Sequence, residues 1–74
     1  MKLTVEEAIE QGLITKVQVR FNGLNLKHCI MADEEAGVVE VHDFDMFRLL
    51  YNSHPIDYVP TKFMRGDVWI LFKD

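Results

Sequence analysis

The residues of this chain that could carry metal chemistry are its histidines and the carboxylates near them. His42-Asp43-x-Asp45, together with His28, supplies imidazole and carboxylate groups. Such groups hold a divalent ion where three or more of them converge. The spacing matches no specific metal motif, however, and His28 falls on the apolar face of a predicted strand, where a hydrogen-bonded core histidine is expected. The sequence therefore predicts no metal site and no cofactor.

Nucleophilic catalysis has equally weak support in the sequence. Ser53-His54 and His28-Cys29 are adjacent pairs, whereas a nucleophile, its base and the orienting group normally converge from separate parts of a chain. The four glycines stand singly at turns, so there is no glycine-rich loop for a phosphate. The chain is therefore predicted not to be an enzyme, and Cys29 is predicted to be a small buried hydrophobe.

A single small domain must position these residues. The chain has 74 residues, of which 49% are apolar, and it carries a net charge of −4. This length gives one domain over 1–74, and such a chain buries only about 60% of its unfolded surface. One cysteine excludes a disulfide-rich scaffold. The negative charge argues against direct nucleic-acid binding, which needs basic patches.

The beginning of the chain has the signature of a short helix. Thr4 and Glu7 form a capping box, apolar residues follow at helical spacing, and Gly12 provides a stop. A helix over 5–11 is expected. The segment 43–51 also has apolar residues at helical spacing, with Asp43 as its cap and Asn52 at its end, and it predicts a second short helix.

The rest of the chain has strand patterns. A hairpin over 16–31 turns at Asn22-Gly23, which needs positive φ at both residues. Its register pairs Phe21 with Leu24 and places Val17 opposite His28. Further strands are expected over 38–42, over 57–64 with Pro60 indicating an edge or a bulge, and over 67–73. The last strand is apolar enough to be covered on both faces, with Trp69 in the core. The predicted fold is α+β, mainly an antiparallel β-meander of about five strands, in a sandwich or a small barrel.

Acidic residues are concentrated in one part of the chain. The segment between His28 and Phe47 carries −6 and contains no lysine or arginine, while the remainder carries +2. A solvated face that keeps the protein soluble is one interpretation. The other is a partner-binding acidic patch that docks on a basic surface. Its residues would be Asp33, Glu34, Glu35, Glu40, Asp43 and Asp45.

Two features bear on the compartment. The longest strongly apolar run, 68–72, is far shorter than the ~20 residues of a membrane span. The first residues include two acids where a signal peptide needs an apolar stretch. With its single cysteine, the chain is expected in a reducing cytosol and away from membranes.

Three segments carry a resemblance to other proteins. They are 17–23 (VQVRFNG), 29–39 (CIMADEEAGVV) and 64–68 (MRGDV). In their order of strands and turns they resemble small, mostly uncharacterised proteins encoded by tailed phages and prophages. The similarity spans most of 17–71, whereas the first helix and the segment 43–56 depart from the pattern. The resemblance implies a phage origin, in the cytoplasm of a bacterial host or in the virion, and it carries over no catalytic residue.

These observations favour a small non-enzymatic phage or prophage accessory protein, associated with the virion or with host takeover. It would act by binding an unidentified protein through the acidic patch or an unpaired edge strand. One alternative is an acidic inhibitor that mimics nucleic acid on a host enzyme. A small metal-dependent enzyme is the other, less supported alternative. A homodimer also stays open, because a small core gains stability from association.

Overall fold

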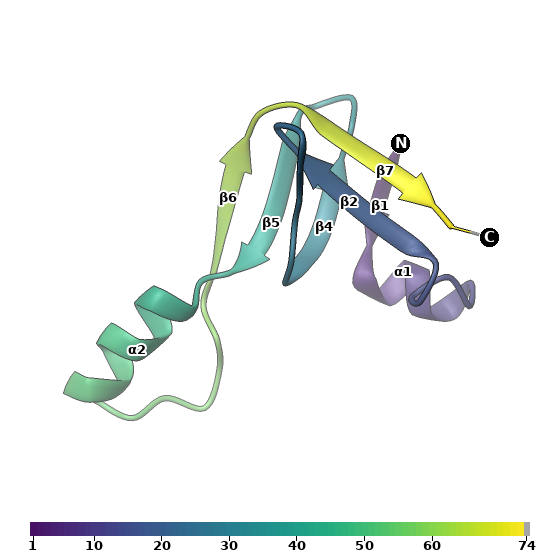
Figure 1. Ribbon diagram of the computed structural model, residues 1–74. Helices are drawn as coiled ribbons and strands as arrows, with labels where there is room; N and C mark the ends of the chain where they lie inside the picture. The colour runs from purple at the N-terminus through teal and green to yellow at the C-terminus, as the bar shows by residue number, and fades with distance from the viewer. Residues whose placement is uncertain (74) are drawn as a thin grey trace.

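The computed structural model describes residues 1–73, and these form two antiparallel sheets and two helices (Figure 1). The first sheet has the order β1-β4-β5-β6 and the second has the order β3-β2-β7. The α+β class is confirmed, and the sheets do not close into a barrel. The elements are β1 (Lys2–Thr4), α1 (Val5–Glu10), β2 (Val17–Phe21), β3 (Leu24–Asn25), β4 (Cys29–Asp33), β5 (Val38–His42), α2 (Phe44–Ser53), β6 (Thr61–Arg65) and β7 (Val68–Phe72).

The first helix follows its sequence signals closely. The Thr4 hydroxyl accepts a hydrogen bond from the Glu7 backbone N–H at 3.1 Å. Gly12 has a φ of 70°, which a residue without Cβ adopts readily, and α1 ends just before it. Thr4 also ends a short strand, β1, which pairs with β4. The sequence did not predict this strand, because three residues are too few to show an alternating pattern.

The predicted hairpin is correct at its turn and wrong beyond it. Asn22 and Gly23 both have positive φ, and Phe21 pairs with Leu24 as expected. The pairing of Val17 with His28 was wrong, because the strand ends after two residues and His28 adopts a φ of 62°. This left-handed residue turns the chain out of the second sheet, and β4 then joins the first sheet beside β5. One predicted strand is thus two strands in different sheets.

Seven apolar residues fill the space between the two sheets. Alternate residues of β5 and β7 point inward, so Val39, Val41, Val68 and Ile70 are buried. The rest of this core is Leu3, Ala8 and Ala32. The prediction that the last strand is covered on both faces was wrong, because only one face of β7, with Val68 and Ile70, packs on the core. Trp69 is on the other face and is 54% exposed, so its predicted place in the core was also wrong.

Three turns meet where the two sheets join, at the top of Figure 1. The Gly66 N–H donates to the Gly37 carbonyl at 2.9 Å, and the Asp67 N–H donates to the Asn22 side chain at 2.8 Å. A Cβ added to Gly66 would lie 2.5 Å from that Asn22 oxygen, so the turns approach one another too closely for a side chain there. This junction holds one end of the sheets together.

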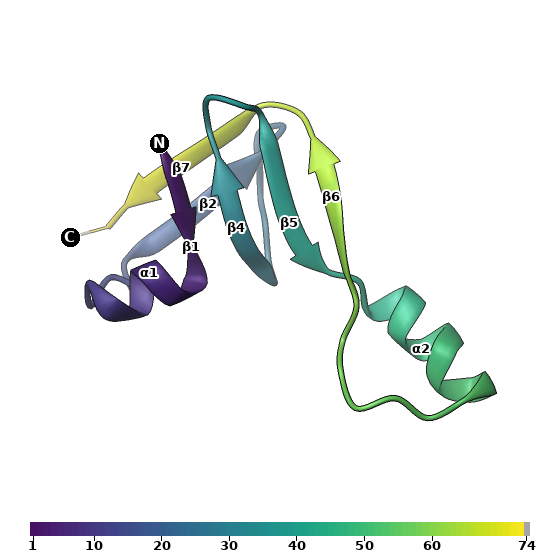
Figure 2. The same ribbon diagram turned by 180° about the vertical axis from the view of Figure 1, so that it is seen from behind.

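The second helix lies away from this junction. It connects β5 to β6 and extends beyond the sheets, as both views show (Figures 1 and 2). Asp43 caps it as predicted, and the helix ends at Ser53, one residue after Asn52. The strand predicted over 57–64 was wrong for 57–60, because β6 begins directly after Pro60, and it is an edge strand, as the proline indicated. The radius of gyration is 13.5 Å, whereas a compact chain of this length has about 11 Å.

Neither of the two helices in residues 1–73 is long and apolar enough to cross a membrane.

Candidate functional site

The six acidic residues of the predicted patch lie in separate groups. Asp33, Glu34 and Glu35 surround the turn between β4 and β5, whereas Asp43 and Asp45 lie at the start of α2. These two groups are at opposite ends of β5, about 20 Å apart at ~3.3 Å per residue of strand. Glu40 is between them, within β5. The acidic residues thus follow one strand from end to end, and do not form a single cluster.

Four of these carboxylates accept hydrogen bonds from the chain itself. Asp33 accepts from the Ala36 N–H and Asp43 from the Met46 N–H, each at 3.0 Å. These bonds cap a turn and the helix α2. Such carboxylates have part of their acceptor capacity occupied within the fold.

Glu40 and Glu34 make the other two contacts. Glu40 accepts from the Thr61 hydroxyl across β5 and β6 at 2.7 Å. Glu34 accepts from the Ile70 N–H at 2.9 Å and lies 3.5 Å from the N-terminal ammonium. It therefore links the turn of the first sheet to β7 of the second. The most exposed acid of this turn is Glu35, whose side chain is 89% exposed.

The two histidines named for metal binding lie against one aromatic ring. The ring of Phe44, the first residue of α2, is 4.8 Å from the His28 ring, edge to face, and 5.9 Å from the His42 ring. The Nδ1 atom of His42 is buried and has no hydrogen-bond partner within residues 1–73. No group of three His, Cys, Asp or Glu side chains in that range is placed to hold a metal ion. The two histidine rings instead contact Phe44, where α2 leaves the sheets.

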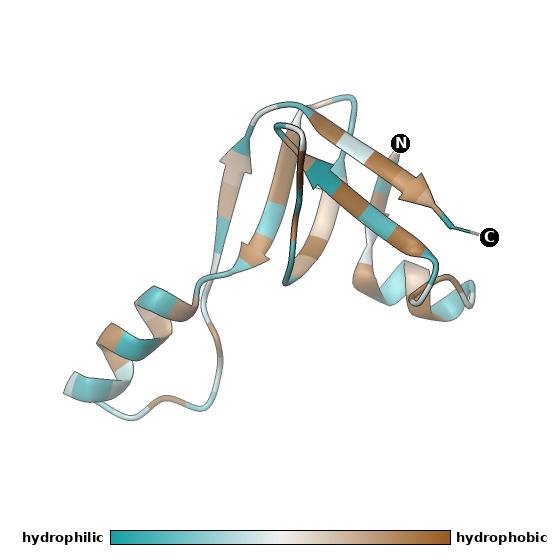
Figure 3. Cartoon of the chain, in the orientation of Figure 1, coloured by the Kyte–Doolittle hydropathy of each residue, from teal (hydrophilic) through white to brown (hydrophobic). Residues whose placement is uncertain are grey.

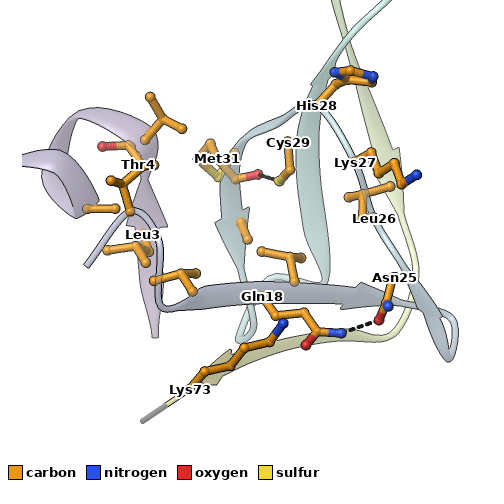
Figure 4. Close-up of a pocket in the computed structure, with 16 residues that line it drawn as sticks. Leu3, Thr4, Gln18, Asn25, Leu26, Lys27, His28, Cys29, Met31 and Lys73 are labelled. Atoms are coloured by element: carbon orange, nitrogen blue, oxygen red, sulfur yellow. Dashed lines mark hydrogen bonds between the residues drawn. The ribbon is translucent and has the colours of Figure 1, made fainter. Parts of the chain in front are cut away.

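Cys29 lies in the groove between the sheets, half-buried. Its thiol donates to the Met31 carbonyl at 3.1 Å (Figure 4). Burial raises the pKa of this thiol above its ordinary value, and the negative charge of Glu40 adds to that effect. A raised thiol pKa opposes nucleophilic chemistry at neutral pH. The sequence predicted a small buried hydrophobe, whereas this residue is half-buried at the wall of the groove.

The groove around Cys29 continues the core toward solvent (Figure 4). Its volume is about 380 Å³, and β2, β4 and the segment 26–28 contribute most of its wall. Apolar side chains such as Leu3, Val17 and Met31 form the floor, with Lys27 and Lys73 at its rim. It is an open gap between two sheets that meet at one end.

The most unusual surface of the molecule is α2. Six of its ten residues are apolar and none of them is buried, as the brown bands along this helix indicate (Figure 3). Within residues 1–73, α2 has only isolated contacts with the other helices and strands. Leu49 is 63% exposed, and Met46, Leu50 and Tyr51 are also exposed. Helices of globular proteins normally bury such a stripe, so this helix lacks the surface that would cover it.

An exposed aromatic residue continues this surface beyond the helix. Tyr58, in the loop after α2, is 59% exposed and lines a shallow hollow with Tyr51. We use the name α2 surface for Met46, Leu49, Leu50 and Tyr51, with Tyr58 at its margin. Apolar patches of this kind mark sites where proteins associate.

The sequence predicted this helix and missed its role. The prediction considered Phe44, Phe47, Leu50 and Tyr51, which suit one buried face. Met46 and Leu49 widen the apolar part to more than half of the helix circumference. This width was the sequence signal for an uncovered helix, because a helix that packs on one side needs only a narrower apolar stripe.

The chain was also compared with known proteins. A scan against protein-family models, a search of curated proteins and a search of solved structures found no match.

Proposed function

We propose that this chain is a non-enzymatic protein that acts by binding another protein through the α2 surface. The observation that carries the proposal is a capped, ten-residue helix with six apolar residues and no buried one. Amphipathic helices bind proteins by laying their apolar face into a complementary groove. In such contacts, large apolar side chains at positions i, i+3 and i+4 serve as the anchors, and the α2 surface has Met46, Leu49 and Leu50 at this spacing.

The acidic patch has less support as the binding surface than the α2 surface has. Four of its six carboxylates already accept hydrogen bonds within the chain. Nucleic-acid mimicry needs carboxylates that are free and gathered together, whereas these follow the length of β5. The acidic residues therefore support the fold and its solubility in this proposal, and apolar contact provides the binding.

The biological setting of this proposal comes from the resemblance of 17–71 to small phage and prophage proteins. It supports an accessory role, in the virion or in host takeover, and a place in the bacterial cytoplasm or in the particle. Purified particles of a phage that encodes the chain distinguish the two roles. A virion component is retained in them through density-gradient centrifugation, whereas a host-takeover protein is recovered from the infected cell and not from the particle.

A pair of matched variants tests the binding proposal. Leu49→Lys places a charge in the centre of the α2 surface, and Asn52→Lys places the same charge on the polar side of the same helix. The wild-type chain and both variants are immobilised and exposed to a bacterial lysate that lacks the chain, and captured proteins are quantified by mass spectrometry. We expect Leu49→Lys to reduce capture of the bound protein about tenfold or more, while Asn52→Lys retains it. Equal capture by all three chains would contradict the proposal.

A further inference from the structure

The free side of α2 has a regular pattern. Met46, Leu49, Leu50 and Ser53 follow one another at positions i, i+3, i+4 and i+7, so their side chains share one side of the helix. Phe44, by contrast, contacts the rings of His28 and His42. The helix is therefore attached to the sheets at its first turn, and it presents the 46–53 stripe outward.

The amount of uncovered surface has a definite size. The chain exposes 5476 Å², whereas a compact monomer of 8.7 kDa exposes about 4700 Å² by the usual scaling with mass. The excess is about 750 Å², and each subunit of a standard-size interface buries about 800 Å². A single interface of ordinary size would thus bring this chain to the exposure of a compact protein.

The charges of α2 permit a second copy to approach. The chain as a whole carries −4, which opposes self-association, but α2 itself carries one acid, Asp45, and one base, Arg48. Two such helices in antiparallel contact bring no net like charge together, and their dipoles are then favourably aligned. The free edge of β6, by comparison, carries Lys62 and Arg65, and such cations discourage the pairing of edge strands.

From these observations we propose that the α2 surface binds a second copy of this chain. The two α2 helices pack antiparallel about a two-fold axis, with the stripes of Met46, Leu49 and Leu50 facing each other. The same surface serves both subunits, as a two-fold interface requires. This inference rests on the proposed function for α2 as the binding surface, and it goes beyond that function by adding another copy of the chain as an occupant of the same surface.

Sedimentation equilibrium of the full chain measures the association. We expect the mass to rise from 8.7 kDa to twice that value between micromolar and millimolar concentration. Leu49→Lys weakens the dimer about tenfold or more, and Asn52→Lys leaves it unchanged. Circular dichroism of both variants establishes that they retain the fold. A monomer at every concentration, or a dimer that Leu49→Lys leaves intact, would overturn the inference.

A distance measurement identifies the surface independently. Cys29→Ser removes the native thiol, and Asn52→Cys then accepts one spin label on the polar side of α2, next to the stripe. Helices in contact lie 8–10 Å apart, and each has a radius of about 5–6 Å with its side chains. We therefore expect an intermolecular distance of about 20–30 Å between the two labels in pulsed dipolar spectroscopy. A label at Gln11→Cys, after α1, is the control and gives a longer distance. A dimer in which the Gln11 labels are close and the Asn52 labels are far apart refutes the α2 interface.

The two proposals fail separately in these experiments. A chain that stays monomeric while its capture of a lysate protein depends on Leu49 keeps the proposed function and loses this inference. A chain that dimerises through α2 and captures no lysate protein in a Leu49-dependent manner keeps the inference and loses the proposed function.

Discussion

At the scale of single residues, the carboxylate of Glu34 has the most consequential position. It accepts from the Ile70 N–H in β7, although it belongs to the turn of the other sheet. Its neighbour Glu35 is 89% exposed and contacts only the N-terminal ammonium among residues 1–73, at 3.7 Å. Two adjacent residues of identical chemistry thus differ in whether they join the sheets, and the sequence alone does not distinguish them.

Glu34→Ala is expected to destabilise the fold, because the Ile70 N–H loses its partner in a half-buried place. Such a loss costs about 1–3 kcal/mol. Glu35→Ala is the matched control and changes stability by less than about 0.5 kcal/mol. Chemical denaturation followed by Trp69 fluorescence measures both variants. Equal effects would show that the link between the sheets does not depend on this carboxylate.

The thiol of Cys29 is expected to react slowly. Because burial raises its pKa, the thiolate is scarce at neutral pH, and alkylation in the native state is slower than in denaturant. The raised pKa also affects stability. Above the ordinary thiol pKa of 9.0, the unfolded chain loses this proton first, so the free energy of unfolding falls as the pH rises.

Native and denatured alkylation rates, measured between pH 7 and pH 10, test this expectation. The Cys29→Ser variant is the control for stability, and its free energy of unfolding lacks the alkaline component. A native thiol that reacts as fast as the denatured one at pH 7 contradicts the assignment of a raised pKa.

At the scale of elements, α2 depends on its cap more than a packed helix does. Asp43 accepts from the Met46 N–H, and loss of a capping residue costs about 1 kcal/mol. Tertiary contacts keep a packed helix folded when its cap is lost, whereas α2 has only isolated contacts with the other helices and strands. Asp43→Ala is therefore expected to increase amide hydrogen exchange within Phe44–Ser53 and to leave the exchange of β5 unchanged. Asp45→Ala, a first-turn acid, has a smaller effect. Increased exchange throughout the sheets would show that α2 is coupled to the core.

The elements also show how much of the fold could be predicted from the sequence. Local signals were sufficient where one residue decides the geometry, as with Thr4 at α1, Asn22 at the hairpin and Pro60 before β6. They failed where the outcome depends on distant partners. The left-handed His28, which moves β4 to the other sheet, has no local signature. Trp69 is exposed because it lies on the uncovered face of β7, opposite the buried Val68 and Ile70, and which face of a sheet is covered depends on how the two sheets pack.

The same distinction between local signals and distant partners applies to the candidate site. The sequence predicted the helix at 43–51 and its cap, because periodicity and a capping residue are local properties. It assigned binding to the acidic residues, since charge is visible in composition. Whether a carboxylate is free or bonded within the fold depends on its neighbours in space, and so does whether an apolar helix is covered.

At the scale of the whole molecule, the sheets and α2 behave as separable parts. None of the seven buried core residues lies between Asp43 and Pro60. His42 and Thr61, which flank that segment, are paired directly across β5 and β6. The chain can therefore be closed at this point by a two-residue Asn-Gly turn, which suits an antiparallel hairpin.

Replacing 43–60 by Asn-Gly is expected to leave a folded β domain that no longer dimerises. The shorter loop stabilises the fold by about 2 kcal/mol through its lower closure entropy, which offsets the lost contacts of Phe44 with the two histidines. Cooperative thermal unfolding and sedimentation of the shortened chain measure the two properties. A chain that unfolds without cooperativity would show that α2 contributes to the core, and one that still dimerises would place the interface on the sheets. A folded monomer is the expected result, because the segment removed carries the whole α2 surface.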